Sequence, residues 1–316
     1  MRSSTAGLVV LSAVLAALAV GCGGAKKAEP EPVQETPDVR TLPDWVSSHL
    51  EQRDGDVFGL IFGTSDHAPG PNRASFVITR PDNSIVQVPE ANVFFGLPGW
   101  KQPMEARARL VPLEPHIDPP GAAPHDHPDA TDLYVANVRF PQPGRYWFVV
   151  EPKDSAERGA GLLTVKKTTF SPAIGSKAIP SDNPTLAEAP PLKITTASPP
   201  DLTLLRHSVA DSLRAQAPFV VAFATPLFCQ TRTCGPAVET LQTVQKRFAR
   251  SGVRFIHIEV YEDNDPKKGT NRWMQEWGLR TEPWVFVVDR KGLVRAKFEG
   301  AVSVGELEDA VRRHLL

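Results

Sequence analysis

The first half of the chain consists of short apolar or alternating runs separated by turn residues. Residues 104–111 alternate with period two over much of their length, as a strand with one buried face does, and residues 81–84 have the composition of a turn. Similar runs predict further strands at 57–62, 74–79, 85–88, 132–140, 145–150 and 161–165. Because short strands joined by turns are typical of antiparallel sandwiches, we predict an all-β sandwich domain over residues 44–170.

After residue 200 the pattern changes to an alternation of amphipathic helices and buried strands. The helix expected at 236–250 begins at Pro236, carries apolar residues at helical spacing and ends before Gly252. The complete series of expected elements is a helix at 204–216, a strand at 219–223, that helix, a strand at 253–260, a helix at 271–277, strands at 284–288 and 293–298, and a helix at 304–315. Residues 201–316 are therefore predicted to form an α/β domain.

Proline and charge refine this division into two domains. The 316 residues include 31 prolines, which are too many for regular elements and therefore mark connections. Residues 22–43 lack apolar periodicity and are predicted to be a disordered tether, whereas the proline-rich residues 171–200 are predicted to be a partly extended interdomain linker. The formal net charge of -1 gives no electrostatic footprint for nucleic-acid binding.

The N-terminus has the pattern of an export signal. Arg2 is followed by a mostly apolar run that ends in small residues before Cys22, so residues 1–21 are predicted to be a signal peptide. The segment Leu18-Ala-Val-Gly-Cys22 resembles the lipobox of bacterial lipoproteins, with Ala19 at the position where leucine is commonest. This resemblance implies cleavage before Cys22, lipidation of Cys22 and a membrane anchor on the extracytoplasmic face. The alternative is an ordinary secreted protein with a cysteine near its cleavage site.

The other two cysteines stand between a predicted buried strand and a predicted helix. Cys229 and Cys234 have the spacing Cys-x4-Cys, and Gly235-Pro236 opens the helix directly after them. The N-terminus of a helix favours a thiolate, because its backbone N–H groups and its dipole stabilise negative charge. Export would place the pair in a compartment where disulfides persist. We therefore predict that Cys229 and Cys234 form a disulfide.

Three features of residues 201–316 resemble the thioredoxin fold. Cys234-Gly235-Pro236 matches the first three positions of the Cys-Gly-Pro-Cys motif, and Glu282-Pro283-Trp284 matches the cis-proline loop that faces the active-site thiols. Gly300 and the helix that follows match the C-terminal strand-to-helix transition of the family. The resemblance implies a mixed sheet flanked by helices, a redox-active pair at Cys229 and Cys234, and a groove shaped by Pro283 for the extended backbone of a partner. It implies no cofactor.

The sequence also departs from the thioredoxin pattern. Ala237 stands where the motif has its second cysteine, and Ala222 stands where thioredoxins keep a buried aspartate that assists proton transfer. Glu282 places a carboxylate near the thiols and opposes thiolate formation, whereas Arg232 between the cysteines favours it.

A second resemblance concerns the first domain. Residues 134–140 and 143–148 resemble the last hairpin of immunoglobulin-like domains in bacterial exported proteins, in which a Pro-Gly turn leads into an aromatic strand. This resemblance implies an immunoglobulin-like fold that spaces or docks the catalytic domain, and no activity of its own.

Together these patterns predict a membrane-anchored, extracytoplasmic thiol–disulfide oxidoreductase-like protein, whose partners would be the thiols or disulfides of exported proteins. A Sco-type copper protein is a competing hypothesis, in which Cys229 and Cys234 bind the metal with a third ligand such as His257. A peroxidase and a non-catalytic interaction module with a structural disulfide are two more. A further group of histidines between the predicted strands could bind copper or zinc or could lie in a solvated loop: His116, His125 and His127.

Overall fold

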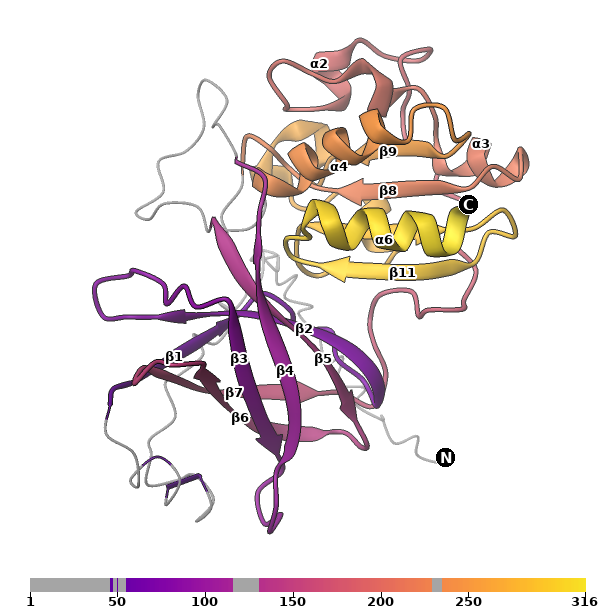
Figure 1. The fold of residues 1–316 in the computed structure, drawn as a ribbon. Helices are drawn as coiled ribbons and strands as arrows, with labels where there is room; N and C mark the ends of the chain where they lie inside the picture. The colour runs from indigo at the N-terminus through magenta and orange to yellow at the C-terminus, as the bar shows by residue number, and fades with distance from the viewer. Residues whose placement is uncertain (1–45, 48–49, 51–54, 116–130, 229–234) are drawn as a thin grey trace, which may run out of the picture. The chain divides into compact units, whose positions relative to one another are not determined.

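The computed structural model describes residues 46–47, 50, 55–115, 131–228 and 235–316 (Figure 1). Residues 34–316 belong to one compact unit. The predicted signal peptide, the predicted tether and several predicted site residues lie outside the described residues. Those site residues are Cys22, His116, His125, His127, Cys229, Arg232 and Cys234.

Seven strands of the first half form one closed sheet in the order β1-β2-β5-β4-β3-β6-β7. β1 pairs antiparallel with β2 on one edge and parallel with β7 on the other, and this second pairing closes the barrel. The strands are β1 (Val57–Phe62), β2 (Gly70–Thr79), β3 (Glu90–Gly96), β4 (Met104–Pro112), β5 (Asp132–Phe140), β6 (Gly144–Pro152) and β7 (Arg158–Val165) (Figure 1).

The barrel corrects the prediction of a two-sheet, immunoglobulin-like sandwich. The all-β character is confirmed, but the pairing of β1 with β7 joins all seven strands into a single closed sheet. Glycines allow this close approach, since a Cβ on Gly159 would lie 2.4 Å from Leu60 Cδ2 and one on Gly161 would lie 2.9 Å from Leu60 Cβ. The expected strand at 85–88 is reduced to one bridge between Thr79 and Ile85, and β3 was not expected.

Aromatic side chains fill the interior of the barrel. Phe95 and Phe148 stack with their ring centroids 5.2 Å apart, and the Phe140 and Tyr146 centroids are 4.8 Å apart. All four side chains are almost completely buried. Their alternation with outward-facing residues along β3, β5 and β6 is the period-two pattern from which strands are predicted.

The second half contains the predicted α/β elements. A four-stranded sheet has the order β11-β10-β8-β9, in which β8 and β9 are parallel and the other pairs are antiparallel. The elements are α3 (Val209–Arg214), β8 (Phe219–Phe223), α4 (Gly235–Arg247), β9 (Arg254–Ile258), α5 (Arg272–Glu276), β10 (Trp284–Val288), β11 (Val294–Glu299) and α6 (Val304–Leu315). The order of these elements along the chain is the one expected from the sequence, and the sheet is mixed, as the thioredoxin resemblance implies.

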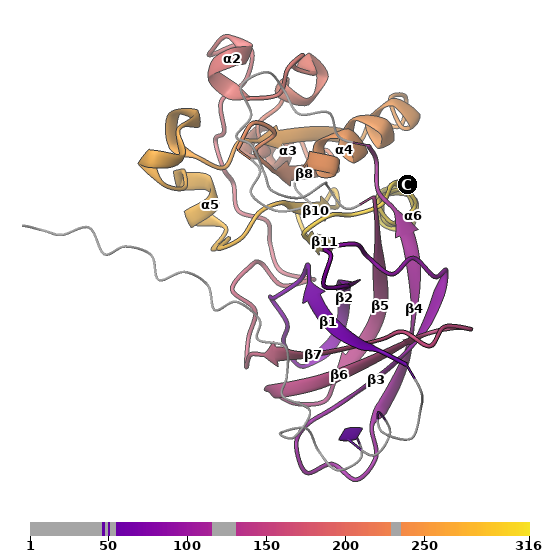
Figure 2. The same ribbon diagram turned by 90° about the vertical axis from the view of Figure 1, so that its left-hand side faces the viewer.

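Helices cover both faces of this sheet. Val220 and Ala222 of β8 pack in one apolar cluster with residues of α4 and α6, which lie side by side (Figure 1). Phe219, Val221 and Phe223 face the other way, into a cluster that includes residues of α3 and α5. Figure 2 shows α5 and α6 on opposite sides of the sheet. β8 is therefore buried on both faces, which explains its uninterrupted apolar sequence.

The proline-rich residues 171–200 pack against the α/β elements. Lys177 forms a bridge with Leu293, and Ala178 belongs to the apolar cluster beside α3 and α5. Trp277 Nε1 donates to Ser181 Oγ over 3.0 Å, and Val209 N donates to Asn183 Oδ1 over 2.9 Å. The segment includes the short helix α2 (Pro191–Ile194). These contacts make the segment part of the α/β layer in addition to a connection between the two halves.

An ion pair joins β2 to the beginning of α6. Arg73 Nε donates to Glu306 Oε1 over 2.7 Å, and Arg73 Nη2 donates to Glu306 Oε2 over 3.1 Å and to Ala301 O over 2.9 Å. Burial alone would raise the pKa of Glu306, but the Arg73 guanidinium and hydrogen bonds from Ser303 hold that pKa below its usual value. The bidentate geometry makes this contact between barrel and α/β layer directional.

His67, which follows β1, makes the stability of the folded protein depend on pH. The side chain is buried, and its Nε2 lies 3.2 Å from Thr64 O. Burial lowers the pKa of His67, although the nearby carboxylates of Glu299 and Asp66 act in the opposite direction. The unfolded chain therefore binds a proton more readily than the folded chain between the lowered pKa and about 6.5, so stability falls as the pH falls through this window.

We expect a His67→Gln variant to lose less stability than the wild-type protein between about pH 7.5 and about pH 5. The measurement is the urea midpoint of unfolding at a series of pH values. An equal loss of stability in both proteins would show that His67 does not cause the acid sensitivity.

Candidate functional site

The Pro283 loop lies at the end of the sheet where the chain leaves β8. β10 runs antiparallel to β8 and pairs Trp284 with Phe223, so Pro283 lies next to the exit of β8 at Ala224. The Glu282–Pro283 peptide bond is cis, which confirms that prediction. Pro283 is buried, and its carbonyl oxygen accepts a 2.8 Å hydrogen bond from Gly300 N.

The cysteine-bearing segment begins and ends at this same end of the sheet. Residues 224–228 continue from β8, with Pro226 buried and Leu227 and Phe228 half-buried. Residues 229–234, which contain both cysteines, lie outside the described residues, and α4 begins directly afterwards at Gly235. The strand expected before the cysteines and the helix expected after them are thus both observed.

Glu259 fixes the start of this segment, and sequence reasoning did not identify it. Its buried carboxylate accepts hydrogen bonds at Oε1 from Thr196 N and Thr196 Oγ1, both over 2.6 Å. Thr196 Oγ1 in turn accepts a 3.1 Å hydrogen bond from Leu227 N. The only sequence signal was an acidic residue among the apolar residues of the strand expected at 253–260.

His257 has the environment of a structural histidine. It is buried in β9 opposite Ala222, with Nε2 3.0 Å from Ala224 O and Nδ1 3.3 Å from Thr195 Oγ1. Both ring nitrogens thus have partners within the protein. The described part of the chain contains no group of three or more histidine, cysteine, aspartate or glutamate side chains that could hold a metal ion.

A pair of aromatic side chains meets the Pro283 loop through Tyr261. Tyr261 Oη donates a 3.3 Å hydrogen bond to Glu282 Oε1, and the Tyr261 and Phe228 rings meet edge to face with centroids 6.2 Å apart. Glu282, which was expected near the thiols from its place before the proline, is therefore oriented by Tyr261. Glu282 was expected here from the sequence, whereas Phe228 and Tyr261 were not.

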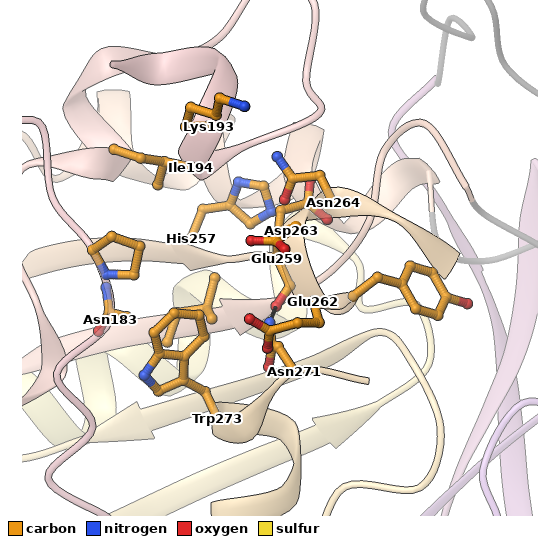
Figure 3. Close-up of a pocket in the computed structure, with 13 residues that line it drawn as sticks. Asn183, Lys193, Ile194, His257, Glu259, Glu262, Asp263, Asn264, Asn271 and Trp273 are labelled. Atoms are coloured by element: carbon orange, nitrogen blue, oxygen red, sulfur yellow. Dashed lines mark hydrogen bonds between the residues drawn. The ribbon is translucent and has the colours of Figure 1, made fainter. Parts of the chain in front are cut away.

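A cavity of about 150 Å³ lies beside the Pro283 loop's neighbour Tyr261, which is one of its lining residues. Figure 3 shows its lining side chains, which include Ile194, His257, Glu259 and Trp273. Asn271 in the wall donates to Glu259 O over 2.5 Å and accepts from Met274 N over 3.0 Å. The cavity has room for about one side chain and holds apolar and acidic groups together.

The comparisons with known proteins found similarity among solved structures. No family model matches the chain, and no curated protein matches it. Among solved structures, the chain is similar to a thiol:disulfide interchange protein of the thioredoxin family from Chlorobium tepidum TLS, with 20% sequence identity and a TM-score of 0.28. The similarity covers 46% of this chain and 97% of that protein. The function of this chain must therefore be inferred from its own residues.

Proposed function

We propose that the protein is a membrane-anchored, extracytoplasmic thiol–disulfide oxidoreductase of the thioredoxin-like type. The observation that supports this proposal best is the position of the Pro283 loop beside the exit of β8, where the cysteine segment begins. The thioredoxin resemblance implies that a loop at this place faces the thiols, and the sequence inserts Cys229 and Cys234 between β8 and α4. The aromatic side chains of Phe228 and Tyr261 border the same region.

In the proposed reaction, the thiolate of one cysteine attacks a disulfide of an exported protein. The partner's S–S bond breaks, one of its sulfurs leaves as a thiolate that takes up a proton, and a mixed disulfide forms. The other cysteine then loses its proton and attacks the mixed disulfide, whose S–S bond breaks, so that the partner's second sulfur leaves as a thiolate and takes up a proton. The products are the Cys229–Cys234 disulfide and a partner with two thiols, so two electrons have passed to the partner. The same steps in reverse oxidise a partner dithiol.

Binding of the partner protein is proposed to depend on the Pro283 loop and on contacts with the partner's backbone, and the proposal includes no cofactor. Pro283 is proposed to shape the groove for an extended partner segment, as the thioredoxin resemblance implies. Ala222 is completely buried and occupies the strand position of the thioredoxin aspartate, so proton transfer here does not use a carboxylate at that position.

The test of this function is the rate at which the full chain, in detergent, reduces a standard protein disulfide when a small thiol supplies electrons. We expect a rate above that of the small thiol alone. A rate equal to that background, with the pair initially reduced, would favour a non-catalytic module with a structural disulfide.

Anchoring is proposed to occur through lipidated Cys22. Among the described residues, no helix is both long enough and apolar enough to cross a bilayer. A Cys22→Ser variant is expected to appear in the soluble fraction or to remain unprocessed, because it cannot receive the acyl chains that hold a lipoprotein on the membrane. Fractionation of cells and the mass of the mature N-terminus measure this. A variant that is normally processed and stays in the membrane would contradict the lipoprotein assignment.

A further inference from the structure

One buried carboxylate connects the barrel with the Pro283 loop. Glu299, the last residue of β11, is only 7% exposed. On the barrel side, its Oε2 accepts hydrogen bonds from the backbone N–H groups of Ser65 and Asp66, each over 2.7 Å, and its Oε1 accepts one from Ser65 Oγ over 2.6 Å. These residues follow β1, 233 or 234 positions away in the sequence.

The same carboxylate holds the Pro283 loop. Thr281 Oγ1 donates to Glu299 Oε1 over 2.9 Å and accepts from Trp284 Nε1 over 3.1 Å. Glu299 is also paired with Trp284 across β10 and β11, and the next residue, Gly300, donates its N–H to Pro283 O. Glu299 therefore contacts residues on both sides of the proline, through its side chain and through the adjoining backbone.

The barrel approaches this point closely. Gly300 has a φ of +71°, and a Cβ placed on it would lie 2.4 Å from Gly63 O. A side chain at position 300 would therefore push the barrel segment at residues 63–66 away from Glu299. Asp66 strengthens the contact, since its carboxylate accepts from Phe170 N over 2.9 Å and from Ser171 Oγ over 2.6 Å.

We propose that Glu299 is a positioning residue through which the barrel segment at residues 63–66 sets the position of the Pro283 loop. The barrel then has a role in recognition of the partner and is more than a spacer. A carboxylate suits this role because it accepts several hydrogen bonds at once, two from backbone groups on one oxygen and two from hydroxyls on the other. The effect on catalysis rests on the proposed thiol–disulfide exchange, whereas the structural link does not.

Two variants of Glu299 separate charge from hydrogen-bond geometry. In Glu299→Gln, the amide oxygen can accept from the N–H groups of Ser65 and Asp66, while the amide N–H₂ can donate to the hydroxyls of Ser65 and Thr281, which also accept. Glu299→Ala leaves these backbone N–H groups without their acceptor. Thr281→Val removes the hydrogen bond between the Pro283 loop and Glu299, and it leaves the hydrogen bonds from Ser65 and Asp66 to Glu299 intact. Arg73→Gln is the matched control, because Arg73 belongs to the same contact region and donates to the backbone carbonyl of Glu299, over 3.5 Å, and to Glu306 and Ala301, but not to the Glu299 carboxylate or to Thr281.

The first readout is the NMR resonance of the Trp284 indole N–H in the full chain, assigned by its loss in Trp284→Phe. We expect this resonance to move in Glu299→Ala and in Thr281→Val, and to stay near the wild-type position in Glu299→Gln and in Arg73→Gln. An unmoved resonance in Glu299→Ala, or an equal shift in Arg73→Gln, would overturn the proposal. If Glu299→Ala does not fold, Ser65→Ala takes its place, because it removes a barrel donor to Glu299 Oε1 and leaves the hydrogen bond between Trp284 and Thr281 in place. An unmoved resonance in Ser65→Ala would then overturn the proposal.

The second readout is the kinetics of disulfide reduction. A displaced loop should raise KM for a protein disulfide by about tenfold, since small misplacements of a binding group are costly. Glu299→Gln should restore KM, and KM for a small disulfide that does not need the groove should be unchanged in all variants. Equal changes for both substrates would overturn the positioning role. Absence of any exchange in the wild-type protein would refute the proposed function, while the Trp284 resonance would still decide the link.

Discussion

Replacing Cys229 or Cys234 by serine is expected to reduce disulfide exchange to the background rate of the small thiol. The reaction needs a thiolate to attack and a second thiol to resolve the mixed disulfide, and a serine hydroxyl does neither at neutral pH. The measurement is the initial rate of reduction of a protein disulfide by each single variant. Cys22→Ser is the matched control, because it also removes one cysteine and should keep the wild-type rate.

The same variants identify the nucleophile. The Gly235-Pro236 neighbours of Cys234 favour it as the nucleophile, whereas the distance of Cys229 from the end of β8 favours Cys229. The sequence alone therefore does not rank the two cysteines. The variant that retains the nucleophile should accumulate a mixed disulfide, seen as a mass increase that a reductant removes. If both single variants exchanged disulfides at the wild-type rate, the cysteine pair would not be the redox site.

Trp277→Ala is expected to destabilise the protein by about 3–5 kcal/mol, the range for removal of a large buried aromatic side chain. The Trp277 ring is 1% exposed, and its centroid lies 5.1 Å from that of Phe223 and 4.7 Å from that of Phe286. The substitution also removes the hydrogen bond to Ser181, which holds residues 171–200 against the sheet. The measurement is the free energy of unfolding from a urea titration.

Trp273→Ala is the control for this loss. Trp273 lies one turn earlier in the chain and is only half-buried, with the Arg272 guanidinium 5.1 Å from its ring centroid. Its removal should cost about 1 kcal/mol, a typical value for a single substitution. Similar losses for the two tryptophans would show that the cluster beside α5 does not stabilise the sheet as proposed.

The α/β half was accessible to sequence analysis because its signals are local. β8 and β10 are buried on both faces and are therefore continuous apolar runs, and Pro236 and Gly252 bracket the helix between β8 and β9. The Pro283 loop was predicted from its place directly before β10, and the cis bond there was confirmed.

The closure of the barrel was not accessible in this way. A period-two pattern shows which residues of a strand face inward, but it does not show which strands become neighbours. The parallel pairing of β1 with β7 joins segments about 100 residues apart and converts the expected pair of sheets into one. Proline content was similarly ambiguous, since it marked residues 171–200 as irregular without showing that they pack against Trp277 and Leu293 of the α/β half.

Glu259 and Glu299 were missed for a related reason. Each is an acidic residue at or just beyond the end of a strand, where acidic residues are usually exposed. Their burial follows from partners far away in the sequence, Thr196 for Glu259 and Ser65 for Glu299. The residues that position the two sides of the candidate site are therefore set by tertiary contacts.

The reduction potential of the Cys229–Cys234 pair tests the central claim most directly. It is measured in the full chain by equilibration with glutathione buffers and by counting free thiols by mass. Structural disulfides in secreted proteins lie below about -300 mV, whereas catalytic ones lie higher. We expect a potential above this limit and a domain that stays folded when the pair is reduced. A potential well below the limit, or unfolding on reduction, would contradict the proposed redox function and would favour a structural disulfide.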